Sequence, residues 1–167
     1  MGFRIQAVEL QNYGNIPPFK CSDFSNINLI IGENATGKTF LLKALYSAVR
    51  SMEDYKRGDD VRSMNEILAE KLRWTFQVDK LGDIVNRSAS ESLRFKLKTD
   101  HPQNCLEYQF SQSTTTKVVN VTAPEAQKEG IVPFAAVVFP NLKKMILILV
   151  LFHYRLPTVL MTPIMIW

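Results

Sequence analysis

One octapeptide constrains this chain more than any other feature. Residues 32–39 read GENATGKT and match the phosphate-binding pattern G-x-x-x-x-G-K-[ST]. An apolar stretch, 27–31, precedes the pattern, and a helical pattern follows it. This is the strand, loop and helix order in which such a loop binds phosphate, so we predict an α/β fold that binds a nucleoside triphosphate.

The residue types at this spacing indicate the chemistry. Gly32 allows a tight turn out of the strand, and the backbone N–H groups of 37–39 converge on the phosphates at the positive end of the helix dipole. Lys38 is placed to reach the β- and γ-phosphates, and the Thr39 hydroxyl to ligate Mg²⁺. We therefore predict ATP and Mg²⁺ as cofactors, with Thr39 on the metal and a nucleotide site formed by Gly32, Glu33, Asn34, Ala35, Thr36, Gly37, Lys38, Thr39 and Phe40.

Two helices follow from the apolar pattern. The first has a stripe at helical spacing, which indicates core packing, formed by Leu41, Leu42, Leu45, Ala48, Val49 and Met52. The second begins at a capping box, Ser63 and Glu66, and we expect it to end within residues 74–76.

The remaining pattern is that of strands. Residues 3–10 predict a first strand whose inward face changes parity near Ala7, as a bulge allows, and 12–22 predict a connection. Alternating apolar residues predict an antiparallel meander whose inward side chains are Leu93, Phe95, Leu97, Leu106, Tyr108, Phe110, Val119 and Val121. A further buried strand is expected at 135–139.

Residues 4–13 and 28–45, taken together, resemble the N-terminal lobe of ABC-type ATPases, most closely the SMC-like and repair-type AAA ATPases. That family's loop usually reads G-x-N-G-x-G-K-[ST], and Ala35 replaces its middle glycine. The resemblance implies a P-loop NTPase of the ABC-ATPase type with an antiparallel β arm and an incomplete core sheet. We expect a nucleotide-binding core over 1–52, a helical insert and β arm over 53–140, and an apolar tail over 141–167.

The resemblance also implies ATP hydrolysis, but the parts that perform it in the family are missing here. No Asp or Glu follows Glu129, and no serine/glycine signature is visible. The best candidate for an apolar strand that ends in an acidic residue is 78–79, and it matches that pattern poorly. We assign no catalytic residue, expect weak nucleotide binding with negligible turnover, and find no support for a productive homodimer.

Contacts with DNA or a nuclease partner are implied by the resemblance alone. Four lysines either lie on one DNA-facing surface or belong to a solvated charged face: Lys80, Lys96, Lys98 and Lys117. Adenine stacking is open to Tyr13 or Phe19, with core packing as the alternative for both.

The C-terminal stretch 145–167 allows three interpretations. Its length and the flanking Lys143 and Lys144 suggest a membrane span, but Arg155 and Pro157 within it argue against one. In the second interpretation the stretch is a core segment of the fold. In the third it is the product of out-of-frame translation, which would explain together the loss of acidic residues, the apolar end and the missing catalytic half.

Composition excludes little. The chain has 167 residues, 46% of them hydrophobic, and a net charge of +4, which neither requires nor excludes nucleic acid. Cys21 and Cys105 are far apart, as expected of reduced thiols in a cytoplasmic protein. Two other functions stay open: a small P-loop kinase or GTPase, although no guanine-reading N-K-x-D occurs, and a non-enzymatic membrane-associated or partner-binding fragment.

Overall fold

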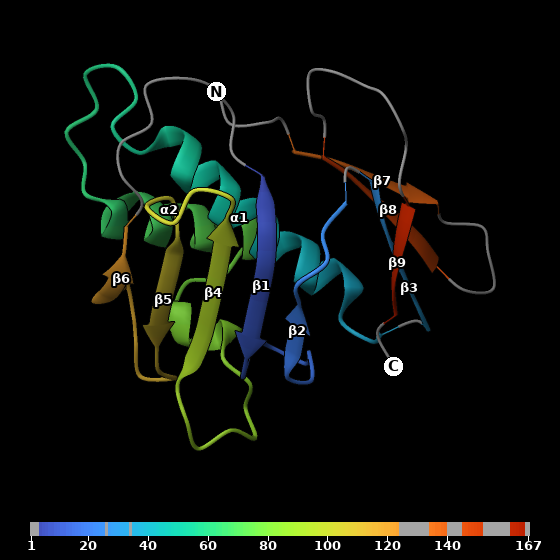
Figure 1. Cartoon of the computed structure of the whole chain (residues 1–167). Coiled ribbons are helices and arrows are strands. Elements are labelled where there is room, and N and C mark those ends of the chain that lie inside the picture. The colour runs from blue at the N-terminus through green and yellow to red at the C-terminus, as the bar shows by residue number, and fades with distance from the viewer. Residues whose placement is uncertain are drawn as a thin grey trace.

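The computed structural model describes residues 4–25, 27–33, 35–123, 134–139, 145–151 and 161–165. In chain order its elements are β1 (Ile5–Gln11), β2 (Phe19–Cys21), β3 (Ile27–Gly32), α1 (Lys38–Asp54), α2 (Met64–Phe76), the 3-10 helix η1 (Leu81–Ile84), β4 (Leu93–Thr99), β5 (Leu106–Phe110), β6 (Asn120–Thr122), β7 (Phe134–Phe139), β8 (Met145–Leu151) and β9 (Met161–Met165). They form an α/β fold with two sheets, and both α-helices lie behind the sheet that contains β1 and β4 (Figure 1).

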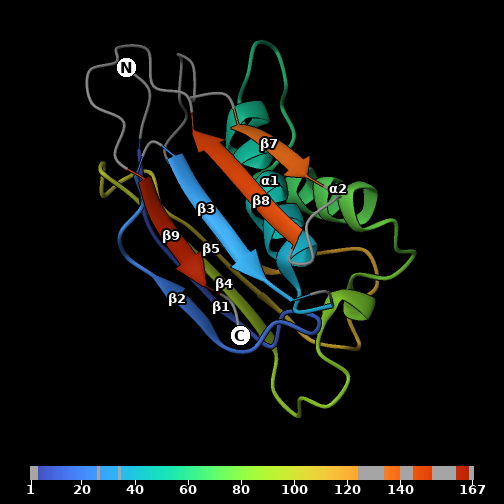
Figure 2. The same cartoon turned by 90° about the vertical axis from the view of Figure 1, so that its right-hand side faces the viewer.

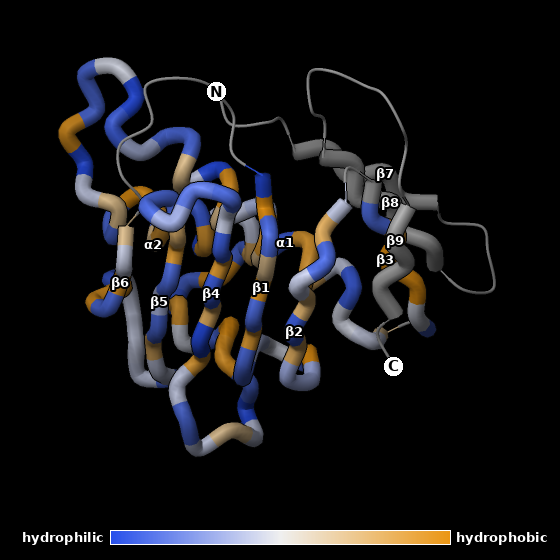
Figure 3. Tube along the Cα trace, viewed as in Figure 1, coloured by the Kyte–Doolittle hydropathy of each residue, from blue (hydrophilic) through white to orange (hydrophobic). Residues whose placement is uncertain are grey.

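The first sheet has five strands in the order β2-β1-β4-β5-β6, and every neighbouring pair is antiparallel. The predicted meander is confirmed, since Phe95 and Leu97 of β4 are buried while Lys98 is exposed. Figure 3 shows the same alternation of hydropathy along β4 and β5. The predicted bulge in the first strand is also confirmed, because the register shifts between Ile5 and Ala7.

Two expectations for this sheet are wrong. The segment 12–22 is not all connection, since β2 pairs with β1 through Val8 and Cys21. Three residues are too few for an alternating pattern to stand out in the sequence. Val119 does not face inward: its side chain is 79% exposed, whereas that of Val118 is buried. The chain enters β6 only at residue 120, so strand pairing does not set the direction of the preceding side chains.

The second sheet has four strands in the order β7-β8-β3-β9 (Figure 2). β3 is antiparallel to β8 and parallel to β9, with Ile31 opposite both Ile146 and Met165. The strand predicted at 135–139 is found as β7. The strand that leads into the phosphate loop therefore lies inside this sheet, between two strands from the C-terminal stretch.

The described parts of the C-terminal stretch, 145–151 and 161–165, are strands of this second sheet. This agrees with the interpretation of the stretch as a segment of the fold. Among the described residues, no helix is both long and apolar enough to cross a membrane. Arg155 and Pro157 lie outside the described residues, and an out-of-frame origin stays a prediction about the gene.

The helices follow the predicted patterns closely. Every residue of the predicted stripe on α1 is buried: Leu41, Leu42, Leu45, Ala48, Val49 and Met52. The capping box of α2 is confirmed, because the Ser63 side chain accepts from the Glu66 N–H and the Glu66 carboxylate accepts from the Ser63 N–H at 2.8 Å. The helix ends at Phe76, as expected. α1 packs against α2 and also contacts β3 and β7 of the second sheet.

A pair of buried tyrosines joins β5 to the segment after β1. The hydroxyl oxygens of Tyr13 and Tyr108 lie 3.1 Å apart, and neither side chain is more than 1% exposed. Phe95 stacks on Tyr108 with ring centroids 4.8 Å apart. Burial raises the pKa of both tyrosines, although the hydrogen bond from Tyr108 partly opposes this shift at Tyr13. Each hydroxyl thus depends on the other for its hydrogen bond.

We expect Tyr13→Phe and Tyr108→Phe each to lower the free energy of unfolding by about 1 to 3 kcal/mol, because either change leaves one buried hydroxyl unpaired. The double variant should be close to the wild type, since no polar group is then left unsatisfied. Urea denaturation of the four proteins gives the coupling energy. Additive losses would contradict the pairing.

The same pair predicts a loss of stability at alkaline pH. Because the folded-state pKa values lie above those of the unfolded chain, this contribution is complete below about pH 10 and falls as the unfolded tyrosines ionise. Denaturation curves of the wild type and of the double phenylalanine variant, compared across this pH range, should show a smaller loss in the variant.

Candidate functional site

The predicted phosphate loop joins β3 to α1. Gly32 is the last residue of β3 and Lys38 the first of α1, with Gly37 as the N-cap. A loop this short places the end of an internal strand directly against the start of a helix. The strand, loop and helix order predicted from the sequence is therefore confirmed, while Asn34 lies outside the described residues.

The start of α1 is open to an anion. Gly37 offers no side chain as a cap, and the first turn contains no acidic residue. The first hydrogen bond of the helix runs from the Leu41 N–H to the Gly37 carbonyl at 2.9 Å. The N–H groups of residues 38–40 thus have no partner within the helix, and they add to the positive end of its dipole.

Lys38 lies inside the loop and not on its surface. Its side chain is 2% exposed, and Nζ donates to the Gly32 carbonyl at 2.8 Å and to the Glu33 carbonyl. Thr36 completes the arrangement, because its hydroxyl donates to the Glu33 carbonyl at 2.9 Å and lies 3.3 Å from Nζ. The hydrogen-bond partners of Nζ are all neutral oxygens, so no carboxylate is paired with Lys38 among the described residues.

Thr39 is exposed, and its hydroxyl has no hydrogen-bond partner among the described residues. The hydroxyl is therefore accessible from solvent. Glu33 is also exposed. The open N–H groups, the buried Lys38 ammonium and the free Thr39 hydroxyl therefore fit a triphosphate with its Mg²⁺, although the residues that the structure describes contain no cluster of acidic, histidine or cysteine side chains suited to a metal.

Two residues of the loop have positive φ angles. Gly37 has φ 88°, and a Cβ atom there would lie 2.9 Å from Cγ1 of Ile16. Ala35, which stands where the resembled family has glycine, has φ 66°. The left-handed conformation costs an alanine roughly 1 to 2 kcal/mol. The loop therefore adopts at Ala35 a geometry that the residue disfavours.

The segment after β1 forms a wall against the start of α1, which the sequence did not indicate. Gly14 sits against the ring of Phe40, since a Cβ atom at Gly14 would lie 2.3 Å from a ring carbon. Ile16 is packed on Gly37 in the same way. Phe40 is half-buried and meets Tyr13 and Phe76, so its side chain serves packing. The one sequence feature that could have indicated this contact is Gly14, at the end of the QNYG sequence.

The proposed adenine-stacking residues are placed in the core. Tyr13 is completely buried and bonded to Tyr108, so core packing is confirmed for it and stacking on a base is excluded. Phe19 is partly buried and packs against the same core. The acid nearest to a strand-end position, Asp79, is exposed in the segment between α2 and η1 and follows no strand.

The four lysines do not share one described face. Lys96 and Lys98 project from the exposed side of β4, where Lys96 pairs with Glu107 at 2.7 Å. Lys117 instead lines a groove beside α2. Since α2 lies on the other side of the sheet, the solvated-face interpretation accounts better for the β4 lysines.

Sequence comparison identifies relatives that are described as the DNA replication and repair protein RecF. The chain is 32% identical over 126 residues to the DNA replication and repair protein RecF of Bacillus cereus (strain G9842), covering 72% of this chain and 31% of that protein. RecF of Bacillus cytotoxicus is 34% identical over 94 residues, or 56% of this chain and 23% of the relative. No family model matches.

One solved structure is described as the recombination mediator protein RecF with ATP in the RecFOR pathway. The match covers 74% of this chain and 28% of the chain in that structure. Its TM-score is 0.48 and its identity 21%. The chain spans about a third of the length of the Bacillus cereus relative, 31%. It is therefore homologous to RecF at low identity and over part of both sequences.

We expect Ala35→Gly to raise the free energy of unfolding by up to about 1 kcal/mol, because glycine has no penalty at this φ angle. Gly37→Ala should destabilise the chain by more than Gly58→Ala. Both glycines have positive φ, but only at Gly37 does a new Cβ atom meet a neighbour within 4 Å. Thermal denaturation ranks the variants, and equal losses at Gly37 and Gly58 would contradict the close packing of Ile16.

Proposed function

We propose that this chain binds ATP with Mg²⁺ through residues 32–39, as the nucleotide-binding part of a RecF-like ATPase of the ABC type. The observation that carries the proposal is the buried Lys38 ammonium, held by loop carbonyls beside an uncapped helix start. In this proposal Lys38 contacts the β- and γ-phosphates and the N–H groups of 37–39 hold the phosphate oxygens.

Mg²⁺ on Thr39 would neutralise charge between the β- and γ-phosphates. The chain's own contribution is then to hold the phosphates in place: a fixed cation, a helix dipole and a loop closed by Thr36. We propose ATP and not GTP as the nucleotide because the sequence lacks the guanine-reading motif N-K-x-D and because a solved RecF is described as a complex with ATP. A role in DNA replication or repair rests on the names of the curated relatives.

Hydrolysis is not part of the proposed activity of this chain. No carboxylate follows Glu129 in the sequence, so the chain does not supply from that region an acid to orient the attacking water. We therefore propose nucleotide binding without appreciable turnover.

We expect the double variant Lys38→Ala/Thr39→Ala to weaken ATP binding at least tenfold, because it removes the phosphate cation and the metal hydroxyl together. Isothermal titration of ATP in the presence of Mg²⁺ measures the change, and chelating Mg²⁺ should weaken binding to the wild type more than to Thr39→Ala. Lys98→Ala, which removes an exposed lysine from the far side of the first sheet, is the matched control. Unchanged binding by the double variant would refute the assignment.

A phosphate-release assay on the wild-type chain should give no signal above that of the Lys38→Ala/Thr39→Ala variant. A higher rate would show that the chain supplies a water-activating group from a position other than the region after Glu129.

A further inference from the structure

The Lys38 ammonium uses all of its hydrogen-bond donors inside the phosphate loop. Nζ carries three N–H groups, and it has three acceptors: the Gly32 carbonyl at 2.8 Å, the Glu33 carbonyl, and the Thr36 hydroxyl at 3.3 Å. If Lys38 is to contact a phosphate through Nζ, it must therefore give up one of these acceptors.

Thr36 is the acceptor that is most easily exchanged. Its contact with Nζ is the longest of the three, and it is the one that a side chain makes. The Gly32 and Glu33 oxygens belong to the backbone, at the end of β3 and directly after it. A charged phosphate oxygen is a stronger acceptor for an ammonium group than a neutral hydroxyl is.

The Thr36 hydroxyl keeps a partner of its own in such an exchange. It donates to the Glu33 carbonyl at 2.9 Å and accepts from Nζ, so it uses its single donor and one lone pair. When Nζ turns to a phosphate oxygen, the donation to Glu33 remains in place. Only the contact between Thr36 and Nζ is lost.

We propose that Thr36 is a positioning residue of the nucleotide site: its hydroxyl holds the Lys38 ammonium in the loop, and a phosphate oxygen of ATP replaces it on binding. This assignment rests on the proposed binding of ATP by residues 32–39. A hydrogen bond that is broken on binding counts against affinity. The Thr36 hydroxyl therefore stabilises the chain in the absence of ATP and weakens its binding of ATP.

The variant Thr36→Val tests this exchange, because valine has the shape of threonine without the hydroxyl. Without ATP the variant should unfold at a lower temperature than the wild type, since one N–H of a buried ammonium loses its acceptor. Isothermal titration of ATP with Mg²⁺ should give an affinity about threefold to tenfold higher, since that N–H regains an acceptor on binding. Thr36→Ser, which keeps the hydroxyl, should match the wild type in both measurements.

Thr99→Val is the matched control for a hydroxyl that serves the fold alone. The Thr99 side chain is buried, and its hydroxyl donates to the His101 carbonyl at 2.9 Å in the connection between β4 and β5. This variant should lower the unfolding temperature and leave the ATP affinity unchanged. A hydroxyl that is exchanged for phosphate instead moves stability and affinity in opposite directions.

A double-mutant cycle with Lys38→Met tests the contact without any ligand. In the Lys38→Met chain, Thr36→Val should lower the unfolding temperature by less than it does in the wild type, because no ammonium is left to lose an acceptor. An equal loss in both backgrounds would show that the hydroxyl acts through the Glu33 carbonyl alone, and it would overturn the proposal.

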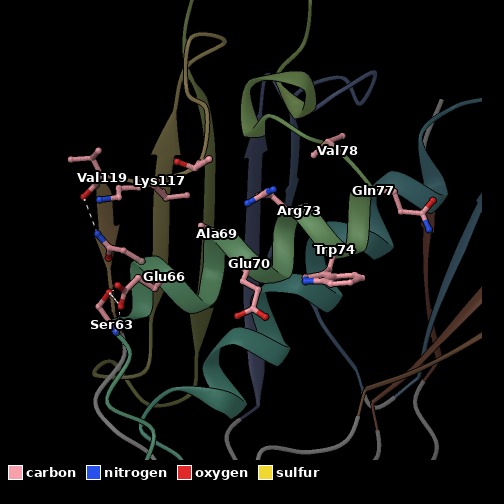
Figure 4. A pocket seen from close by; sticks show the side chains of 13 residues that line it. Ser63, Glu66, Ala69, Glu70, Arg73, Trp74, Gln77, Val78, Lys117 and Val119 are labelled. Carbon is pink, nitrogen blue, oxygen red and sulfur yellow. Dashed lines mark hydrogen bonds between the residues drawn. The ribbon is translucent and has the colours of Figure 1, made fainter.

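ATP in the loop must also be distinguished from ATP bound elsewhere. A groove of about 810 Å³ beside α2 is large enough for a nucleotide, and Arg73, Trp74 and Lys117 are among the residues that line it (Figure 4). None of its lining residues belongs to the loop. Trp74→Ala should therefore leave the ATP affinity unchanged, in the wild type and in the Thr36→Val chain. Loss of ATP binding in Trp74→Ala would place the nucleotide in the groove and overturn both proposals.

The failure of this proposal differs from that of the proposed function. If the wild type does not bind ATP, or binds it as tightly after Lys38→Met, the proposed function fails and the exchange fails with it. If the wild type binds ATP through Lys38 but Thr36→Val binds it no more tightly, the proposed function stands and the exchange is overturned.

Discussion

The buried ammonium of Lys38 is the interaction on which the phosphate loop depends. A lysine with 2% exposure is tolerable only if its hydrogen bonds are satisfied, and here the Gly32 and Glu33 carbonyls satisfy them. These carbonyls come from the end of β3, while the lysine begins α1. The same contacts therefore fix the turn between strand and helix and leave the helix N–H groups facing outward. Binding a phosphate through Nζ, as proposed, would exchange at least one of these hydrogen bonds for one to a phosphate oxygen, since Nζ has only three N–H donors.

Packing from outside the loop supports this turn. Ile16 lies on Gly37 and Gly14 on Phe40, so the segment after β1 holds the start of α1 in place. Tyr13, which immediately precedes Gly14 in the chain, is anchored to Tyr108 of β5. The first sheet is thereby connected to the loop through a few close contacts. A change at Tyr108 is expected to reach the phosphate site through this packing.

The sequence predicted the elements whose residues have a strong local pattern. The α1 stripe, the Ser63 and Glu66 capping box and the alternation in β4 and β5 are each determined by spacing within one segment. What it missed depends on contacts across the chain. β2 has only three residues, the side chain of Val119 precedes its strand, and the wall of Gly14 and Ile16 arises only when β1 and α1 meet.

The position of β3 has a consequence for how the chain reaches its folded state. In the ladder Gly32 is opposite Met145, and Ile27 is opposite both Val150 and Met161. These partners are separated from β3 by more than a hundred residues, so during synthesis the strand before the phosphate loop emerges long before either neighbour exists. Contacts of such high sequence separation form slowly. An apolar strand with two open edges must therefore wait until residues 145–165 have been made, which makes β3 a natural point for chaperone binding or for aggregation in the meantime.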